Sequence, residues 1–298
     1  MTTPSSTTAP YVRWESNTWT GSGEGRINED FALVEPAGLC AVLVDGATGL
    51  TKANVVAGES DAAWFARNLT RELVAGLSDP VATAEEVFPA AGARVAARFR
   101  CIPGASELQR IDEPNGSVAA LRWTQGSATI ALLGDCTVVA LMADGSTHVF
   151  HDDTLTKLDD LNYERMYAWA TERGATMAEA RRALNPRFVE NRLKMNEPGG
   201  YWAADISCRG MTHLLTYTLP LEGVAGLFAC SDGYAAAVDM GVVTDAGELA
   251  RHVAAGQGPA VGEELRAAER ADAGCWRVHR SKTSDDATYL YVGFDVQV

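Results

Sequence analysis

Residues 42–46 read VLVDG: three apolar residues, two of them β-branched, lead directly into an aspartate and a glycine. The same pattern recurs downstream, as LLGD at 132–135 and as FACSDG at 228–233. Two acidic pairs, at 29–30 and 285–286, instead come directly before apolar runs. Apolar runs of this length predict buried β-strands. The sequence therefore places carboxylates where several strands begin or end.

The remaining apolar pattern predicts the order of elements around these strands. We expect strands at residues 31–34, 39–44, 117–123, 128–133, 138–142, 214–219, 224–230 and 287–294. Helical periodicity predicts helices at residues 52–77, 87–99, 163–173, 177–184, 234–240, 246–254 and 261–271. Because most strands are joined by short turns, the sheets should be largely antiparallel, with the helices packed outside them.

One strand pair should bring two of the acidic sites together. The turn sequence EPAG at 35–38 predicts a hairpin with residue 31 opposite residue 42. Glu29 and Asp30 would then lie beside Asp45, at the open end of the hairpin. A single Asp-Gly pair is more often a simple turn, but converging carboxylates repel each other, and a divalent cation is the usual compensation. Oxygen ligands without Cys or His favour Mg²⁺ or Mn²⁺ over zinc.

Composition narrows the class of protein. The 298 residues are 47% hydrophobic, which is enough for a large core, and Asp+Glu outnumber Lys+Arg by 39 to 25, a net charge of -14. Such an acidic chain is repelled by nucleic-acid backbones and anionic membranes, so we expect neither as a partner. Six cysteines without CxxC spacing, and no signal or membrane-length apolar stretch, predict a reducing, cytoplasmic setting.

Five acidic motifs carry a family resemblance. They are NED at 28–30, VDG at 44–46, GD at 134–135, SDG at 231–233 and DDAT at 285–288. In order and context they resemble the metal-dependent protein phosphatase family of type 2C, in a bacterial-type single-domain form, over roughly residues 20–295. The resemblance implies an α+β fold, an αββα sandwich of two antiparallel sheets flanked by helical pairs. It also implies hydrolysis of phosphoserine and phosphothreonine in a protein substrate by a metal-bridging water.

The resemblance also implies a dinuclear Mg²⁺ or Mn²⁺ site with named ligands. Asp45 resembles the carboxylate that bridges both ions, and the Gly46 carbonyl resembles a ligand of one of them. Asp232 and Asp285 resemble the other direct ligands, with Asp285 preferred over Asp286 from the register of the motif.

Three further positions are assigned to the same site by the resemblance. Glu29 and Asp30 resemble residues that hold metal-bound waters, and Asp135 resembles the ligand of a weak third ion. In-line attack by a metal-bound water needs no protein nucleophile, which fits a chain without a Ser-His-Asp or Cys-His pattern.

Phosphate binding has two candidate sources. The family usually has an arginine at the position of Gly25, and here Arg26 follows it by one residue. Arg26 is therefore the expected phosphate ligand and the fourth catalytic residue, after the three aspartates. A basic cluster at residues 277–282, with the sequence RVHRSK, is the alternative.

Two other positions differ from the family pattern. Ala47 replaces a histidine that would protonate the leaving group, unless one of His148, His151, His213 or His279 lies in the cleft. Ala236 replaces an aspartate that would hold the third ion. These differences leave two alternatives open: a low-activity module that binds phosphate or metal, and a dimetal phosphatase of small phosphorylated metabolites.

The expected domain organisation is simple. Residues 1–12 should form a flexible tail and residues 13–298 a single phosphatase-like domain, with a variable flap at about 151–205. Within the flap, Arg192 and Asn196 are candidates to line the cleft, whereas packing is the expected role of Tyr201 and Trp202.

Overall fold

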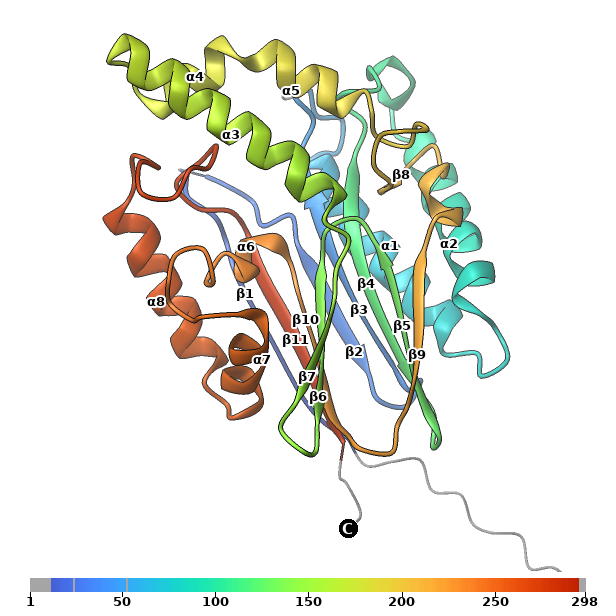
Figure 1. Cartoon of the computed structure of the whole chain (residues 1–298). Coiled ribbons are helices and arrows are strands. Elements are labelled where there is room, and N and C mark those ends of the chain that lie inside the picture. Colours follow the sequence, from blue (N-terminus) through green and yellow to red (C-terminus); the bar gives the residue numbers. More distant parts are fainter. Residues whose placement is uncertain (1–11, 24, 52, 295–298) are drawn as a thin grey trace, which may run out of the picture.

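The computed structural model describes residues 12–23, 25–51 and 53–294. Two sheets stand face to face, with helices on both outer sides and a further group of helices across one end (Figure 1). All strand pairings among the described residues are antiparallel. The predicted αββα sandwich of two antiparallel sheets, an α+β fold, is confirmed.

The first sheet has five strands, in the order β1 (Val12–Trp19), β11 (Ala287–Phe294), β10 (Val224–Cys230), β6 (Thr137–Met142) and β7 (Thr147–Phe150). The second has the order β2 (Phe31–Glu35), β3 (Cys40–Ala47), β4 (Asn115–Trp123), β5 (Ser127–Leu133) and β9 (Leu215–Pro220), and the two-residue β8 (Ala204–Asp205) pairs with β4. The predicted tail lies outside the described residues, except for Val12, which begins β1.

The central strands are buried on both faces, which explains why they are continuously apolar and do not alternate with polar residues. In β3, Leu43 points into the core between the sheets. Val42 and Val44 point to the other face and pack under helices. Leu227 of β10 and Leu290 of β11 complete the core between the sheets from the opposite side.

Two pairs of helices cover the outer faces. Helices α1 (Asp61–Leu77) and α2 (Ala84–Arg100) pack on the second sheet, and α7 (Ala246–Ala254) and α8 (Gly258–Ala271) pack on the first. The prediction that the first helix begins at residue 52 is wrong. Ser60 caps α1 by accepting a hydrogen bond from Ala63 N–H, and the Asp61 carboxylate binds the N–H groups of Val55 and Val56, which holds the preceding residues in a loop.

The segment after β7 forms three helices across one end of the sandwich, α3 (Thr154–Arg173), α4 (Met177–Ala183) and α5 (Asn185–Arg192) (Figure 1). Met166, Ala170, Met177 and Ala180 form a small core of their own, which Cys275 from the loop before β11 completes. These helices are therefore attached to the sandwich partly through that loop.

The other short elements connect the layers. They are α6 (Asp232–Ala235) and the 3-10 helices η1 (Ala105–Glu107) and η2 (Gly210–Thr212). The helix predicted at 234–240 is shorter than expected, because α6 gives way to turns that end at Gly241 with a φ of 72°.

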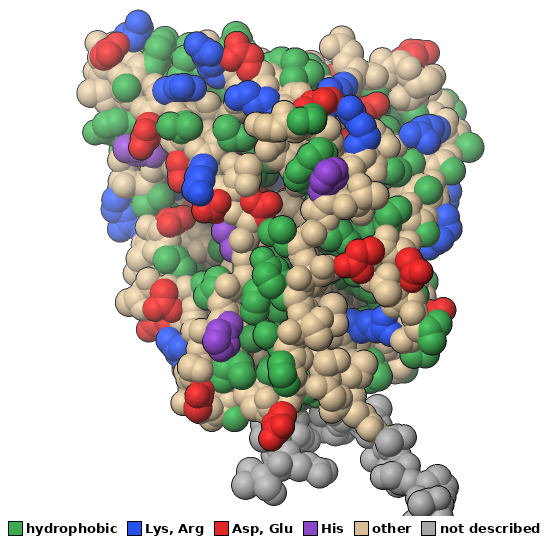
Figure 2. All heavy atoms as spheres, turned by 45° about the vertical axis from the view of Figure 1, so that its right-hand side comes forward, with side chains coloured by type: hydrophobic (Ala, Val, Ile, Leu, Met, Phe, Trp, Pro, Cys, Tyr) green, Lys and Arg blue, Asp and Glu red, His purple; other side chains and the backbone are tan. Residues whose placement is uncertain are grey.

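Charged side chains of both signs gather over the upper part of the face in Figure 2, and a strip of hydrophobic side chains runs below them. The acidic excess of the sequence is therefore not collected into one patch on this face. Among the described residues, no helix has both the length and the apolar character needed to cross a membrane.

Candidate active site

Carboxylates from both sheets meet at the end of the sandwich that α3 crosses. Asp30 precedes β2, Asp45 lies near the end of β3, and Asp135 lies between β5 and β6. Asp232 begins α6 directly after β10, and Asp285 comes two residues before β11. Each of the five is placed by a strand whose apolar residues are anchored in the core.

The register of β2 and β3 brings Asp30 opposite Asp45. The structure pairs Phe31 with Val44, two residues beyond the predicted partner Val42, so the predicted register is wrong. The observed register extends to Asp30 beside Asp45. Gly46 follows at a point of close approach, because a Cβ atom there would lie 2.4 Å from the Glu29 carbonyl oxygen.

Hydroxyl groups orient two of the carboxylates. Ser231 Oγ donates to Asp30 Oδ2 at 2.9 Å and also accepts a hydrogen bond from Thr288 N–H at 2.9 Å. Ser117 Oγ donates to Asp135 Oδ1 at 2.6 Å and accepts from Asp135 N–H at 3.1 Å. The other oxygen of Asp30, Oδ1, is buried without a hydrogen-bond partner. A buried carboxylate oxygen in this state is available to a cation.

The carboxylates are close enough to disturb one another's ionisation. Burial raises the pKa of Asp30 to about 7, against the opposing hydrogen bonds from Thr288 and Ser231. Burial, together with repulsion from Asp30 and Asp232, raises the pKa of Asp45 well above its usual range.

Asp232 and Asp135 are affected in the same way. The protein around Asp232 limits the solvation of its carboxylate, although the side chain reaches the water of the cleft. This effect and repulsion from Asp285 and Asp135 raise the pKa of Asp232 well above its usual range, and a hydrogen bond with Asp45 opposes the rise. Burial raises the pKa of Asp135, against the hydrogen bond from Ser117. These carboxylates therefore ionise together only when cations compensate their charge.

Asp285 and Asp286 have different surroundings. Lys282 Nζ lies 2.5 Å from Asp285 Oδ2, and Arg26 Nη2 lies 3.2 Å from Asp285 Oδ1. Asp286 is buried and accepts hydrogen bonds from the backbone N–H groups of Gly21, at 2.7 Å, and Glu29, at 2.9 Å. Asp285 therefore faces cations, whereas Asp286 holds the backbone before β2 in place.

The Glu29 carboxylate has a hydroxyl partner. It accepts a hydrogen bond from the Thr48 hydroxyl, and Glu29, like Asp30 and Asp45, is not among the residues that line the cleft. Arg192 of α5 approaches the same loop, where its Nη2 donates to the Thr48 carbonyl oxygen at 3.3 Å and its Nη1 is buried without a partner.

The segment that follows α5 contains three further residues considered above, Asn196, Tyr201 and Trp202, and their side chains make contacts away from the cleft. Asn196 Oδ1 accepts a hydrogen bond from Ala203 N–H, Tyr201 is buried, and Trp202 stacks on His213 with 3.4 Å between the ring centroids. None of the three lines the cleft.

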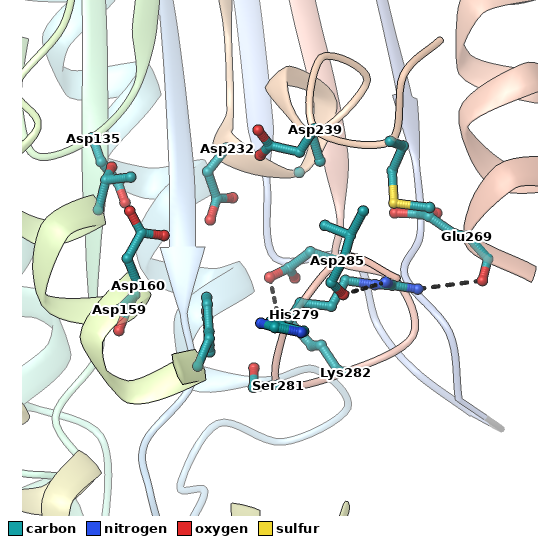
Figure 3. A pocket seen from close by; sticks show the side chains of 17 residues that line it. Asp135, Asp159, Asp160, Asp232, Asp239, Glu269, His279, Ser281, Lys282 and Asp285 are labelled. Atoms are coloured by element: carbon teal, nitrogen blue, oxygen red, sulfur yellow. Dashed lines mark hydrogen bonds and ion pairs between the residues drawn. The ribbon is translucent and has the colours of Figure 1, made fainter. Parts of the chain in front are cut away.

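The carboxylates open into a cleft of about 170 Å³. Asp135, Asp232 and Asp285 lie along it (Figure 3). The motif residue Gly233, Ala236 and residues 278–282 of the basic cluster also line it. The lining residues that were not predicted from the sequence are Thr156, Asp159, Asp160 and Tyr163 of α3, Asp239 and Met240 after β10, and Glu269 of α8. The paired aspartates at 159–160, in a polar stretch before the helix predicted at 163–173, are the signal that could have pointed to this part of α3.

Of the four histidines considered as proton donors, His279 lines the cleft, and its ring stacks on Tyr167 of α3 at 4.0 Å. His151 lies nearby, where its Nδ1 pairs with Thr137 Oγ1 at 3.2 Å. Ala47 ends β3 opposite Asn115, and Ala236 lines the cleft without an oxygen ligand in its side chain.

The donor set fits a hard divalent cation, because it consists of carboxylate oxygens of which one is buried and unpartnered. As the described residues stand, however, no three His, Cys, Asp or Glu side chains are close enough to hold a metal ion together. Binding requires these carboxylates to draw together, and Lys282 competes with the ion for Asp285.

This fold is that of bacterial serine/threonine phosphatases, which confirms the resemblance at the level of the fold. The chain is similar to the serine/threonine phosphatase PstP/Ppp of Mycobacterium tuberculosis, with 15% identity and a TM-score of 0.54 over 95% of this chain and 98% of the other. PppA, a regulatory component of T6SS in Pseudomonas aeruginosa, is similar at 17% identity and a TM-score of 0.51, over 96% and 99% of the two chains.

A structure of the PstP catalytic domain, 14% identical over 96% of this chain and 99% of that one, with a TM-score of 0.51, contains two manganese ions. No family model and no curated protein sequence matches this chain. At these identities the likeness concerns the fold.

Proposed function

We propose that this protein is a Mg²⁺- or Mn²⁺-dependent phosphatase that hydrolyses phosphoserine and phosphothreonine in protein substrates. The observation that carries the proposal is the convergence of five carboxylates, one from each of five strand ends, at one end of a serine/threonine phosphatase fold, where Asp135, Asp232 and Asp285 line a cleft. Their mutual repulsion has no function in a stable apolar core, and a pair of divalent cations would relieve it.

The residues divide into distinct roles. Asp45, Asp232 and Asp285 would hold two ions, with the Gly46 carbonyl as a further ligand. Asp30, held by Ser231, would position a metal-bound water. When bound, the ions supply an activated water and neutralise the phosphoryl oxygens.

Glu29 and Asp135 would support the site without binding the two main ions directly. Glu29 would act on a bound water from beside Thr48, and Asp135, oriented by Ser117, would hold a weak third ion.

Two other residues complete the proposal. Arg26 is anchored by Asp285 and by Asp286, whose Oδ2 lies 3.5 Å away, and this places its guanidinium beside the reacting centre to bind phosphate. His279 supplies an imidazole to the cleft that can protonate the leaving group in place of the histidine absent at Ala47.

Hydrolysis of p-nitrophenyl phosphate with Mn²⁺, with Mg²⁺ and with EDTA tests the proposal. We expect turnover that depends on metal, and we expect Asp45→Asn to abolish it and to weaken Mn²⁺ binding in calorimetry by more than about tenfold, since even groups that only support a metal ligand have effects of that size. Asp144→Asn is the matched control, because Asp144 lies at the far end of β6 from Asp135 and is exposed. Unchanged Mn²⁺ affinity in Asp45→Asn would remove Asp45 from the centre.

The ion pairs to Asp285 favour one alternative, a family-fold module that binds metal or phosphate with little turnover. Mn²⁺ binding without hydrolysis would support that module. Where hydrolysis is found, comparing phosphopeptides with small phosphorylated metabolites decides the substrate class.

A further inference from the structure

Lys282 forms an ion pair with Asp285, one of the carboxylates that the proposed function assigns to metal binding. Its Nζ lies 2.5 Å from Asp285 Oδ2, and its side chain forms part of the cleft wall (Figure 3). An amino group paired with a carboxylate is charged at neutral pH, where even an isolated lysine is protonated.

The other basic side chains of the cluster at 277–282 are committed to the loop. Arg280 binds the Asp272 carboxylate at 2.6 Å and donates to four backbone carbonyls, those of Glu269, Asp272, Val278 and Thr283. Arg277 Nη2 donates to the Met240 carbonyl at 3.1 Å. These two guanidinium groups hold the loop in shape, whereas Lys282 has a carboxylate of the cleft as its partner.

The Lys282 contact and metal binding at Asp285 compete with each other. An ammonium group 2.5 Å from Asp285 Oδ2 takes one of the acceptor sites of that oxygen, and it repels a cation that binds the same carboxylate. The lysine stem is flexible and its side chain is 40% exposed, so it can move along the cleft. Arg26 keeps a second anchor at Asp286 and does not need to move.

A phosphate group entering this cleft needs positive charge from the protein. The cleft is lined by six aspartates and Glu269, while Lys282 is the lysine among the lining residues. A dianion would be repelled by these carboxylates at close range. An ammonium group released from Asp285 would be available to the phosphoryl oxygens of a substrate in the cleft.

We propose that Lys282 exchanges partners, neutralising Asp285 in the metal-free protein and binding the phosphoryl oxygens of the substrate once Asp285 binds metal. The proposal rests on the function proposed above. It makes Lys282 both a competitor of the metal and a phosphate ligand. These two effects have opposite signs when the lysine is removed.

Lys282→Met separates the two effects because methionine keeps much of the length without the charge. In calorimetry with Mn²⁺ we expect the variant to bind metal about tenfold more tightly, the size expected for loss of one charge-assisted contact. Without metal, its thermal midpoint should fall, because the carboxylates lose a counter-charge. Added Mn²⁺ should raise that midpoint by more than it does in the wild type.

Phosphate binding should change in the opposite direction. At saturating Mn²⁺, inorganic phosphate should inhibit Lys282→Met about tenfold more weakly, and the KM for p-nitrophenyl phosphate should rise by a similar factor. Lys157→Met is the matched control, since Lys157 forms a 2.6 Å ion pair with Asp153 on α3 but is 70% exposed and does not line the cleft. That control should leave both affinities unchanged.

The outcomes distinguish this inference from the function on which it rests. A wild-type protein that binds no Mn²⁺ and hydrolyses no phosphoester contradicts the proposed function. A wild type that does both, with unchanged Mn²⁺ affinity or unchanged phosphate inhibition in Lys282→Met, overturns the inference alone. Lys282→Gln repeats the measurement if the methionine variant does not fold.

Discussion

Asp285 and Asp286 are adjacent aspartates with separate tasks. Asp285 is partly exposed and contacts Lys282 and Arg26, while Asp286 is buried and accepts two backbone hydrogen bonds. A carboxylate that accepts two N–H groups cannot be replaced by an amide without turning an NH₂ group toward one of these donors. Position in the sequence alone does not reveal this difference.

We therefore expect Asp286→Asn to lower the free energy of unfolding by about 1–3 kcal/mol, the cost of a lost buried hydrogen bond. Asp285→Asn should instead leave the stability of the metal-free protein nearly unchanged and weaken Mn²⁺ binding. Urea unfolding and calorimetry on both variants measure the two quantities. If Asp286→Asn unfolds normally but fails to bind Mn²⁺, the roles of the two residues are exchanged.

Helix α3 brings its own carboxylates to the cleft. Asp159 is half-buried, and burial raises its pKa to about 7, with repulsion from Asp135 added and the charge of Arg192 opposing it. In the unfolded chain an aspartate has a pKa of about 3.9. Between roughly pH 4 and pH 7 the folded protein therefore binds a proton that the unfolded chain does not, so stability falls as the pH rises through that window.

Asp159→Asn should remove this part of the pH dependence and make the metal-free protein more stable than the wild type at pH 8. Urea unfolding at pH 5, 6, 7 and 8 in the presence of EDTA measures the slope. Asp153→Asn is the control at the residue that precedes the same helix, because the hydrogen bond from Lys157 lowers the pKa of Asp153 and moves its titration below the window. If the free energy of unfolding of Asp159→Asn changes with pH as steeply as that of the wild type, other carboxylates of the cleft account for the pH dependence.

On the scale of the whole molecule, the first sheet is completed by pairing one end of the described chain with the other. Strand β1 pairs with β11 over eight residues, from Val12 opposite Phe294 to Trp19 opposite Ala287. Trp19 stacks on Tyr234 of α6 with ring centroids 5.6 Å apart, next to the residue that begins α6, Asp232. The strand at the start of the described chain thereby supports two of the acidic motifs.

Two tryptophans on β1 test this support. Trp19→Ala should lower the free energy of unfolding by about 2–4 kcal/mol, because it removes a large, half-buried ring packed against the core. Trp14→Ala is the matched control, since Trp14 is 53% exposed and its loss should cost less than about 0.5 kcal/mol. Equal effects of the two substitutions would contradict a supporting role for Trp19.

Local pattern was sufficient to predict most strands and antiparallel sheets with helices outside them, whereas the αββα arrangement was predicted from the family resemblance. A strand buried on both faces is continuously apolar, so β10 and β11 could be bounded from their residues alone. Strand β1 was not predicted, because it lies at a sheet edge and its sequence, VRWESNTW, is largely polar. The assignments of the acidic residues to metal, and of residues 13–298 to one domain, stay predictions.

The sequence by itself determined that carboxylates lie at strand ends, because the switch from apolar to acidic residues is a local signal. Only the tertiary structure decided which groups face them. The turn spans residues 36–39, with Leu39 at a φ of 53°, and lies one residue later than the predicted turn at 35–38; this displacement shifts the register by two residues and brings Asp30 opposite Asp45. The contacts of Asp159 and Lys282 depend on how a helix and a loop pack across the end of the sandwich, and packing between residues distant in sequence leaves no local pattern to read.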